Sequence, residues 1–338
     1  EIIIKTFKSN GFVLSEPDVL LDSDYIIERS GEKFRSSMLT FDREDGKTMC
    51  LRPDLTVASC INFLQKKSSS KIYYSGQAYR RSSGKGTNFI HDQLGIEILG
   101  SKNQIQDDFK VLSTILNSAK KIKRKKIQIK VGDISLFKNL INALDMPERW
   151  KLRLVRHYWK PSYFEELLKR LEQNSDIDAV TFDSDKKRFY EMKKTNQDKI
   201  IAGRSISEIL KRFDKKIKDP RSFTDGKKIV KIITSFLKIN CKLSELEERL
   251  LDFTKKNNLK KNIFRDFKSI LNLKKLNQDI NFIANFGRDV EYYTGIVFEV
   301  LSGKKEIARG GRYDDLLKSL GAKKNIPAVG AAINLKNI

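Results

Sequence analysis

The stretch RDVEYYTGIVFE at residues 288–299 decides the fold assignment of this chain. It joins an arginine and a tyrosine pair to an apolar segment typical of a β-strand. The stretch RGGRYD follows at residues 309–314. Taken alone, the tyrosines are typical of core aromatics and the glycine pair is typical of a turn. The two stretches gain meaning from their order along the chain with two segments upstream.

The upstream segments are LRPDLT at residues 51–56 and QLGIE at residues 93–97. Glu97 stands in an otherwise apolar strand, where a buried carboxylate without a partner is costly. A selective site for a free amino acid needs a fixed cation for the carboxylate, acceptors for the ammonium and a partner for the side chain. Arginine suits the first task because its guanidinium forms a bidentate fork. The four segments together supply each of these groups.

In their order along the chain, the four segments resemble those of the histidyl-tRNA synthetase family, within the class II aminoacyl-tRNA synthetases. The helix, strand and proline expected at residues 2–17 resemble the first class II motif, which builds a dimer interface in that family. The resemblance implies an α+β fold: a class II synthetase-like antiparallel sheet flanked by helices, with a helical insertion. It predicts a synthetase-like core at residues 1–135 and 276–338 and a mostly helical insertion at residues 136–275.

The resemblance also implies a histidine-binding site. In the family pattern, arginines grip the ligand carboxylate, an acidic residue and a threonine hold the ammonium, and a glutamate and a tyrosine contact the ring. The residues at these positions are Asp54, Thr56, Arg80, Gln93, Glu97, Arg288, Tyr292 and Tyr293. Asp54 is one methylene shorter than the glutamate of the family. We expect no catalytic residue, because neither His91 nor His157 lies near a nucleophile motif, and no cofactor or metal.

The nucleotide part of the family pattern is depleted. The segment AVGAAINLKN at residues 328–337 resembles the third class II motif, but Asn337 stands where the family carries an ATP-binding arginine. The loop GKGTNFIHDQ at residues 84–93 lacks the arginines of the family's G-R-x-R-x-F-x-Q run. Triphosphate binding needs several fixed cations. Because no anticodon-binding domain follows in this sequence either, we expect histidine sensing rather than aminoacylation.

Within the superfamily, three segments resemble the regulatory subunits of ATP phosphoribosyltransferase: SGEKFR at residues 30–35, LRPDLT, and AGRSISEI at residues 202–209. That resemblance implies a non-catalytic chain that dimerises within a hetero-oligomer. It would activate a short catalytic subunit and confer feedback inhibition by L-histidine on the first step of histidine biosynthesis. Two alternatives stay open: a divergent or truncated histidyl-tRNA synthetase that activates histidine with ATP, and an RNA-binding module.

The composition bears on the partners. The formal net charge is +24, but the basic residues are spread along the chain and are not interleaved with aromatics. A stacking platform for nucleic acid needs that interleaving, so the charge does not favour a nucleic-acid partner. No run of 18 apolar residues and no signal-peptide pattern is present, which excludes a membrane span. The three cysteines are scattered, and we expect a cytoplasmic protein.

Overall fold

The computed structural model describes all of the chain except residues 24–25, 28–36, 67–69, 82–88, 123–125, 174–178, 195–199, 202–203, 219–223, 265–266, 289 and 338. The described residues form two compact units. The first contains Glu1–Phe137 and Leu237–Ile338, and the second contains Lys138–Phe236. Residues 237–275, which the sequence analysis placed in the insertion, therefore group with the first unit.

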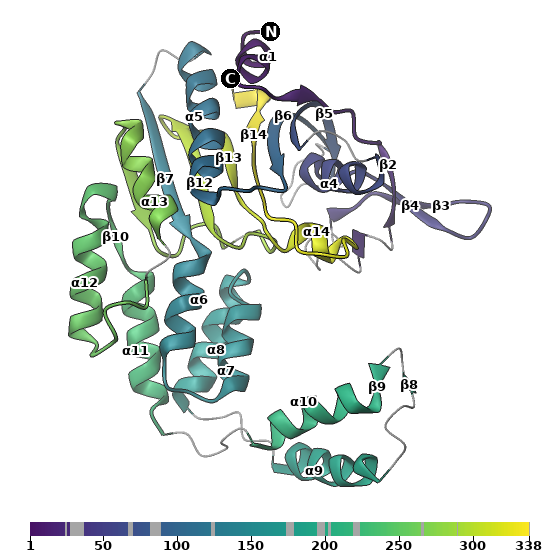
Figure 1. Ribbon diagram of the computed structural model, residues 1–338, viewed down its shortest axis with the longest axis vertical. Coiled ribbons are helices and arrows are strands. Elements are labelled where there is room, and N and C mark those ends of the chain that lie inside the picture. The colour runs from purple at the N-terminus through teal and green to yellow at the C-terminus, as the bar shows by residue number, and fades with distance from the viewer. Residues whose placement is uncertain are drawn as a thin grey trace. The chain divides into compact units, whose positions relative to one another are not determined.

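A nine-stranded sheet is the centre of the first unit (Figure 1). Neighbouring strands are antiparallel except for two parallel pairs, β1 with β5 and β7 with β11. The predicted α+β fold with a mainly antiparallel sheet is confirmed. The strands, in their order across the sheet, are β1 (Val13–Leu14), β5 (Lys71–Tyr79), β6 (Ile90–Leu99), β14 (Ala328–Asn334), β13 (Lys305–Arg312), β12 (Ile296–Ser302), β7 (Ile127–Asp133), β11 (Ile280–Ile283) and β10 (Asn240–Lys242).

Helices cover both faces of this sheet (Figure 1). Helix α4 (Leu55–Lys66) lies on the face to which Glu97 points, because Thr56 donates a hydrogen bond to Glu97. Helix α5 (Gln104–Ile122) lies on the other face, where Asp108 pairs with Arg312. Side chains alternate between faces along a strand, so these two contacts mark opposite sides of the sheet. The short helices α1 (Ile2–Ser9) and α13 (Lys268–Asn272) pack against α5.

A small three-stranded sheet precedes α4. Its strands are β2 (Leu20–Asp22), β4 (Thr48–Leu51) and β3 (Thr40–Asp42), in that order across the sheet. Strands β3 and β4 form a hairpin whose turn contains Asp45 and Gly46, with the Lys47 N–H donating to Asp45 Oδ1 at 3.2 Å. The SGEKFR segment, which carried part of the predicted resemblance, lies outside the described residues.

Residues 237–275 join the first unit through pairing that is distant in sequence. β10 pairs with β11, some forty residues further along the chain, and α13 packs against α5. The remaining described helices of this part of the first unit are η1 (Leu243–Glu245), α12 (Leu246–Lys256) and η2 (Leu273–Leu276). Two more, α14 (Leu316–Ser319) and η3 (Leu335–Asn337), lie near the end of the sequence.

The second unit is mostly helical, as predicted for the insertion. Apolar residues at helical spacing, such as Phe164, Leu167, Leu168 and Leu171 of α8, are buried and form its core with Trp150 of α7. Its elements are α7 (Glu148–Arg156), α8 (Pro161–Gln173), α9 (Ala179–Lys193), β8 (Ile200–Ile201), β9 (Arg204–Ser205), α10 (Ile206–Lys218) and most of α6 (Ile134–Ala143) and α11 (Gly226–Leu237). Of the AGRSISEI segment, Ala202 and Gly203 lie outside the described residues.

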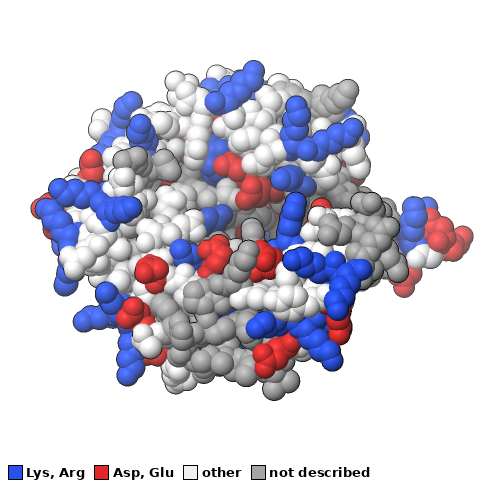
Figure 2. All heavy atoms as spheres, turned by 60° about the horizontal axis from the view of Figure 1, so that its bottom comes forward, with Lys and Arg blue, Asp and Glu red and all other residues white. Residues whose placement is uncertain are grey.

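Two surface properties follow. None of the described helices is long and apolar enough to cross a membrane. On the face drawn in Figure 2, lysine and arginine side chains are interspersed with aspartate and glutamate rather than gathered into one basic surface.

Candidate functional site

Glu97 is the centre of a buried hydrogen-bond cluster on the α4 face of the sheet. Its side chain is fully buried in β6. Oε1 accepts hydrogen bonds from Thr56 Oγ1 at 2.7 Å and from Tyr74 OH at 3.2 Å. Oε2 accepts a short hydrogen bond from Tyr313 OH. Three hydroxyl donors, from α4, β5 and the end of β13, therefore compensate the burial of this carboxyl group.

Two glycines make room for the cluster. Gly330 lies directly opposite Glu97 in the β6–β14 pairing, and a Cβ atom there would fall 1.3 Å from Glu97 Oε2. Gly95 lies opposite Tyr74, and a Cβ atom there would fall 2.3 Å from the Tyr74 hydroxyl. Both close approaches require glycine, because only a residue without a side chain leaves this space.

Three tyrosine rings stand beside Glu97. The ring of Tyr292 meets the rings of Tyr293 and Tyr313 edge to face, at centroid distances of 5.1 and 5.8 Å. The backbone fixes this arrangement, because Thr294 N donates to Arg312 O at 2.8 Å and Asp314 N donates to Thr294 Oγ1 at 2.9 Å. The predicted residues Tyr292 and Tyr293 are thus held next to Tyr313, which binds Glu97.

The LRPDLT segment places Asp54 beside the cluster and Arg80 against the same segment. Asp54 Oδ1 accepts the Val57 N–H at 3.0 Å and so caps the start of α4. Arg80 Nη1 donates to the Pro53 carbonyl at 3.1 Å. Asp54 also acts electrostatically on Glu97, Tyr74 and Tyr292. Asp54 therefore has both a structural role and a position within reach of the cluster.

Gln93 and Arg288 border the cluster in less direct ways. Gln93 precedes Glu97 by four residues in the same regular strand, so both side chains lie on one face of the sheet. Arg288 is half-buried in the turn after β11, four residues before Tyr292. The roles of Gln93 and Arg288 toward a ligand remain predictions.

The electrostatics of the cluster are unusual. Burial, with a smaller contribution from the charge of Asp54, raises the pKa of Glu97 from 4.5 to about 7, against the lowering effect of the hydroxyl hydrogen bonds. Burial, followed by the charges of the two carboxylates, holds the pKa of Tyr74 well above its usual range. The groups with the largest influence on Glu97 include no cation among the described residues. The cluster can therefore receive a positive charge from a ligand.

The residues at positions where the family binds ATP form hydrogen bonds within this chain. Asn337 Nδ2 donates to the Glu306 carbonyl at 2.6 Å, and Lys336 Nζ donates to the Ile90 carbonyl at 3.2 Å. The charges of Arg80 and Lys336 add to the effect of burial in lowering the pKa of His91. The loop between Arg81 and Phe89, including Lys85, lies outside the described residues.

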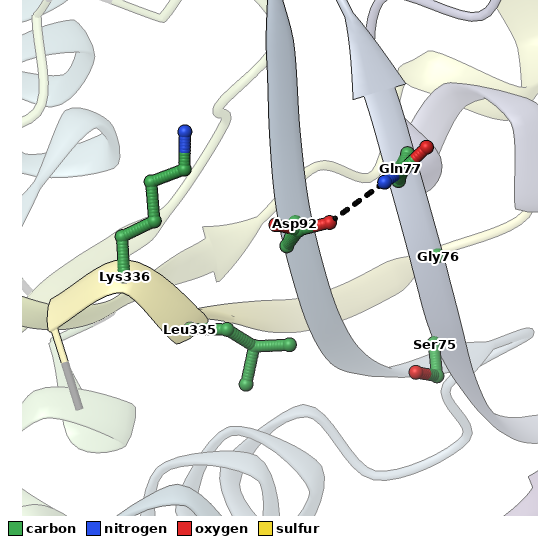
Figure 3. Close-up of a pocket in the computed structure, with 6 residues that line it drawn as sticks. All are labelled: Ser75, Gly76, Gln77, Asp92, Leu335 and Lys336. Atoms are coloured by element: carbon green, nitrogen blue, oxygen red, sulfur yellow. Dashed lines mark hydrogen bonds between the residues drawn. The ribbon is translucent and has the colours of Figure 1, made fainter.

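A pocket of about 240 Å³ opens beside Asp92 and Gln77 (Figure 3). Gln77 Nε2 donates to Asp92 Oδ1 at 3.0 Å there, and Lys336 and Leu335 of η3 border it. Asp92 precedes Glu97 by five residues, so its side chain lies on the opposite face of the sheet. This pocket is consequently separate from the Glu97 cluster.

The sequence analysis assigned no role to Tyr74 or Tyr313, which both donate to Glu97. Tyr313 lies within the RGGRYD stretch, and Tyr74 lies opposite Gly95. A glycine paired with a tyrosine in neighbouring strands was the available signal, because it leaves space for the ring to turn across the sheet face.

Comparison with known proteins agrees with this geometry. An ATP phosphoribosyltransferase regulatory subunit from Allorhizobium ampelinum is 28% identical, over 99% of this chain and 95% of that protein. One from Brucella anthropi is 27% identical, over 96% of this chain and 92% of that protein. The predicted resemblance to these subunits is confirmed.

Solved structures support the fold. A Bacillus halodurans protein described as an ATP phosphoribosyltransferase regulatory subunit/histidyl-tRNA synthetase matches with a TM-score of 0.63 and 16% identity, over 99% of this chain and 76% of that one. Histidyl-tRNA synthetase from Nostoc sp. PCC 7120 matches with a TM-score of 0.62 and 14% identity, over 99% and 68%. The family model described as histidyl-tRNA synthetase matches residues 1–338, and the chain belongs to this family.

Proposed function

We propose that this chain is a non-catalytic regulatory subunit of ATP phosphoribosyltransferase that binds L-histidine. In this role it activates a short catalytic subunit, which joins ATP to phosphoribosyl pyrophosphate, and it confers feedback inhibition by histidine. The observation that carries the proposal is the likeness over nearly the whole chain to proteins named as that subunit. The buried Glu97 cluster supports the histidine part of the proposal.

The proposed ligand site extends from the Glu97 cluster to two arginines. Glu97, with Tyr293 and Tyr292 beside it, would contact the imidazole ring. Asp54 and Thr56 would hold the ammonium group, with Gln93 near the ligand backbone. Arg288 and Arg80 would hold the carboxylate, since guanidinium groups bind carboxylates in a bidentate manner. A wrong amino acid would leave buried polar groups unpaired, which makes such a site selective.

Regulation requires that histidine bind one state of the complex more tightly than another. The segment from Arg288 to Tyr293 is a suitable moving part, because it joins two strands and carries three of the proposed ligand contacts. Histidine would draw Arg288 toward the Glu97 cluster, and this closure would be transmitted to the catalytic partner.

Self-association as a dimer is part of the proposal. Among the described strands, β1 stands at the edge of the sheet and pairs with β5. Large apolar side chains are exposed around this edge, and an exposed apolar edge is suited to contact with another chain. They are Ile2, Val13, Leu14, Val19 and Leu20.

The test measures phosphoribosyl-ATP formation by a short catalytic subunit, with and without this chain, and then with added histidine. We expect stimulation by the chain and inhibition by histidine. The variant Arg288→Ala should still stimulate but should lose the histidine response. Arg249→Ala, which removes an exposed arginine of α12, is the matched control and should behave as wild type. A chain that changes nothing in this assay contradicts the proposal.

A second candidate is a divergent histidyl-tRNA synthetase that activates histidine with ATP. The whole-chain match to the synthetase family favours it. The replacement of the expected arginine by Asn337, whose amide is bound to the Glu306 carbonyl, argues against it. Histidine-dependent exchange of pyrophosphate into ATP would establish this activity, and its absence would leave the regulatory role.

A further inference from the structure

Glu97 accepts three hydrogen bonds from the described residues, fewer than a carboxylate can accept. A carboxylate offers about four lone-pair sites. Thr56 and Tyr74 use two sites on Oε1, and Tyr313 uses one on Oε2. Among the described residues, Oε2 has one hydrogen-bond donor and Oε1 has two, so a further donor to this carboxyl group would bind at Oε2.

Among the described residues, the groups with the largest influence on Glu97 include no cation. Each element packed around the carboxyl group presents hydroxyl, thiol or acidic groups, and β14 presents Gly330, which has no side chain. These groups are Asp54, Thr56 and Cys60 from the α4 region, Tyr74 from β5, Tyr313 after β13, and Tyr292 and Tyr293 before β12. Asp54 is the charged group that acts on Glu97 most strongly, and it has the same sign. A buried carboxylate in this setting is stable only with a proton or a cationic partner.

We infer that this site selects histidine in its imidazolium form, and that binding takes up a proton from solution at mildly alkaline pH. The inference rests on the proposed function, because it concerns the charge of the ligand that the same site binds. The ring N–H of an imidazolium donates a second, charge-assisted hydrogen bond to Oε2. A neutral ring forms a weaker bond and leaves Glu97 without a compensating charge.

The expected proton balance follows from the groups involved. At pH 8 the free histidine ring is almost entirely neutral, since an imidazole has a pKa near 6.5. With a Glu97 pKa of about 7, the free carboxyl group is also mostly ionised at pH 8. In the complex, the imidazole ring and the Glu97 carboxyl group together hold one titratable proton. Binding therefore takes up about 0.9 proton at pH 8. Near pH 6 the free partners together hold more than one proton, so the sign of the exchange reverses there.

The experiment is isothermal titration of the full chain with histidine at pH 8, in phosphate and in Tris. The difference in observed enthalpy between these buffers gives the number of protons taken up. We expect about 0.9 for the wild type. Glu97→Gln should bind histidine at least about tenfold more weakly and with uptake near zero. Asp92→Asn is the matched control, because it neutralises a carboxylate of the same strand on the opposite face of the sheet and should change neither value.

The outcomes separate this inference from the proposed function. Histidine binding without proton uptake at pH 8 overturns the inference alone and means that a neutral ring donates to ionised Glu97. No histidine binding at all overturns the proposed function, and the inference falls with it. Nitrogen NMR of bound, ring-labelled histidine then locates the proton: two imidazolium-like nitrogens support the inference, and a neutral ring despite uptake places the proton on Glu97 and contradicts it.

Discussion

Gly330 and Glu97 face each other across β14 and β6, and the Glu97 carboxyl group occupies the space that a side chain at residue 330 would need. A Cβ atom on Gly330 would lie 1.3 Å from Glu97 Oε2, so the carboxyl group and a methyl group cannot share this place. The position of the carboxyl group, and with it the Thr56, Tyr74 and Tyr313 hydrogen bonds, depends on this glycine.

The substitution Gly330→Ala should therefore displace Glu97 and break part of the cluster. Overpacking of this kind costs about 1–3 kcal/mol of unfolding free energy, which urea unfolding measures. The double variant Gly330→Ala/Glu97→Ala removes the clashing group, so its cost should be clearly smaller than the sum of the two single costs. Additive costs would show that residue 330 and the carboxyl group do not compete for space.

Much of this architecture could be predicted from local sequence. Strands such as β5 and β7 can be read from the sequence because each is a regular run of suitable length beside turn residues. Glu97 stood out because an acidic residue in an apolar strand demands partners. Those partners could not be predicted, because strand alternation fixes the face of Tyr74 but not where its hydroxyl points. That direction depends on Gly95 in the neighbouring strand.

Non-local pairing explains why residues 237–275 group with the first unit rather than with the insertion. β10 has three residues, Asn240–Lys242, in a region with the periodicity of helices. Only its pairing with β11 makes it a strand, and sequence patterns do not report a partner forty residues away. The second unit consequently ends at Phe236, whereas the resemblance to the synthetase family placed the end of the insertion at residue 275.

The stability of the chain should depend on Glu97 ionisation. The pKa of Glu97 is raised from 4.5 to about 7. Its contribution to the free energy of unfolding is therefore fully present below pH 4.5 and is lost as the pH rises through 7. Burial raises the pKa of Asp133 to about 6. Asp133 therefore loses most of its contribution to the free energy of unfolding at a lower pH than Glu97 does. Between pH 6 and pH 8 the free energy of unfolding of the wild type should fall by roughly 1 kcal/mol more than that of Glu97→Gln.

Urea unfolding at these two pH values measures that difference. Asp92→Asn is again the control, because its carboxylate lies on the other face of the sheet, beside Gln77. It should retain the wild-type pH dependence. Equal pH dependence in the wild type and in Glu97→Gln would show that Glu97 does not titrate in this range.

A second buried charge cluster supports the site from the opposite face. Arg312 donates to Asp108 Oδ1 from Nε at 2.9 Å and from Nη2 at 2.6 Å, and both side chains are almost fully buried. Its Nη1 donates to Asp314 at 2.8 Å. Because Tyr313 lies between Arg312 and Asp314, this ion pair holds the residue that binds Glu97.

Loss of one partner should be severe. Arg312→Met leaves Asp108 charged and buried, and such losses cost about 3–5 kcal/mol of unfolding free energy. The double variant Arg312→Met/Asp108→Leu should recover a large part of that cost, since it leaves no unpaired charge. Denaturant unfolding of the two variants makes the comparison. A double variant as unstable as the single one would mean that packing, rather than charge, accounts for the loss.

The edge strand β1 provides a test of self-association. Val13 and Leu14 are 55% and 50% exposed, and none of the described strands pairs with the outer side of β1. A dimer would bury these side chains, and burying a single leucine contributes about 1.5–3 kcal/mol. A charge introduced there should therefore raise the Kd of the dimer at least about tenfold.

The variant Leu14→Glu tests this expectation by analytical ultracentrifugation over a range of concentrations. The control is Leu152→Glu in helix α7, because Leu152 is 63% exposed but lies in the other unit. The wild type and the control should sediment as dimers where Leu14→Glu sediments as a monomer. If all three sediment alike, the apolar edge at β1 is not a contact between two copies of this chain. Its exposed side chains would then be available to the catalytic subunit, and Leu14→Glu should instead abolish the stimulation of phosphoribosyl-ATP formation.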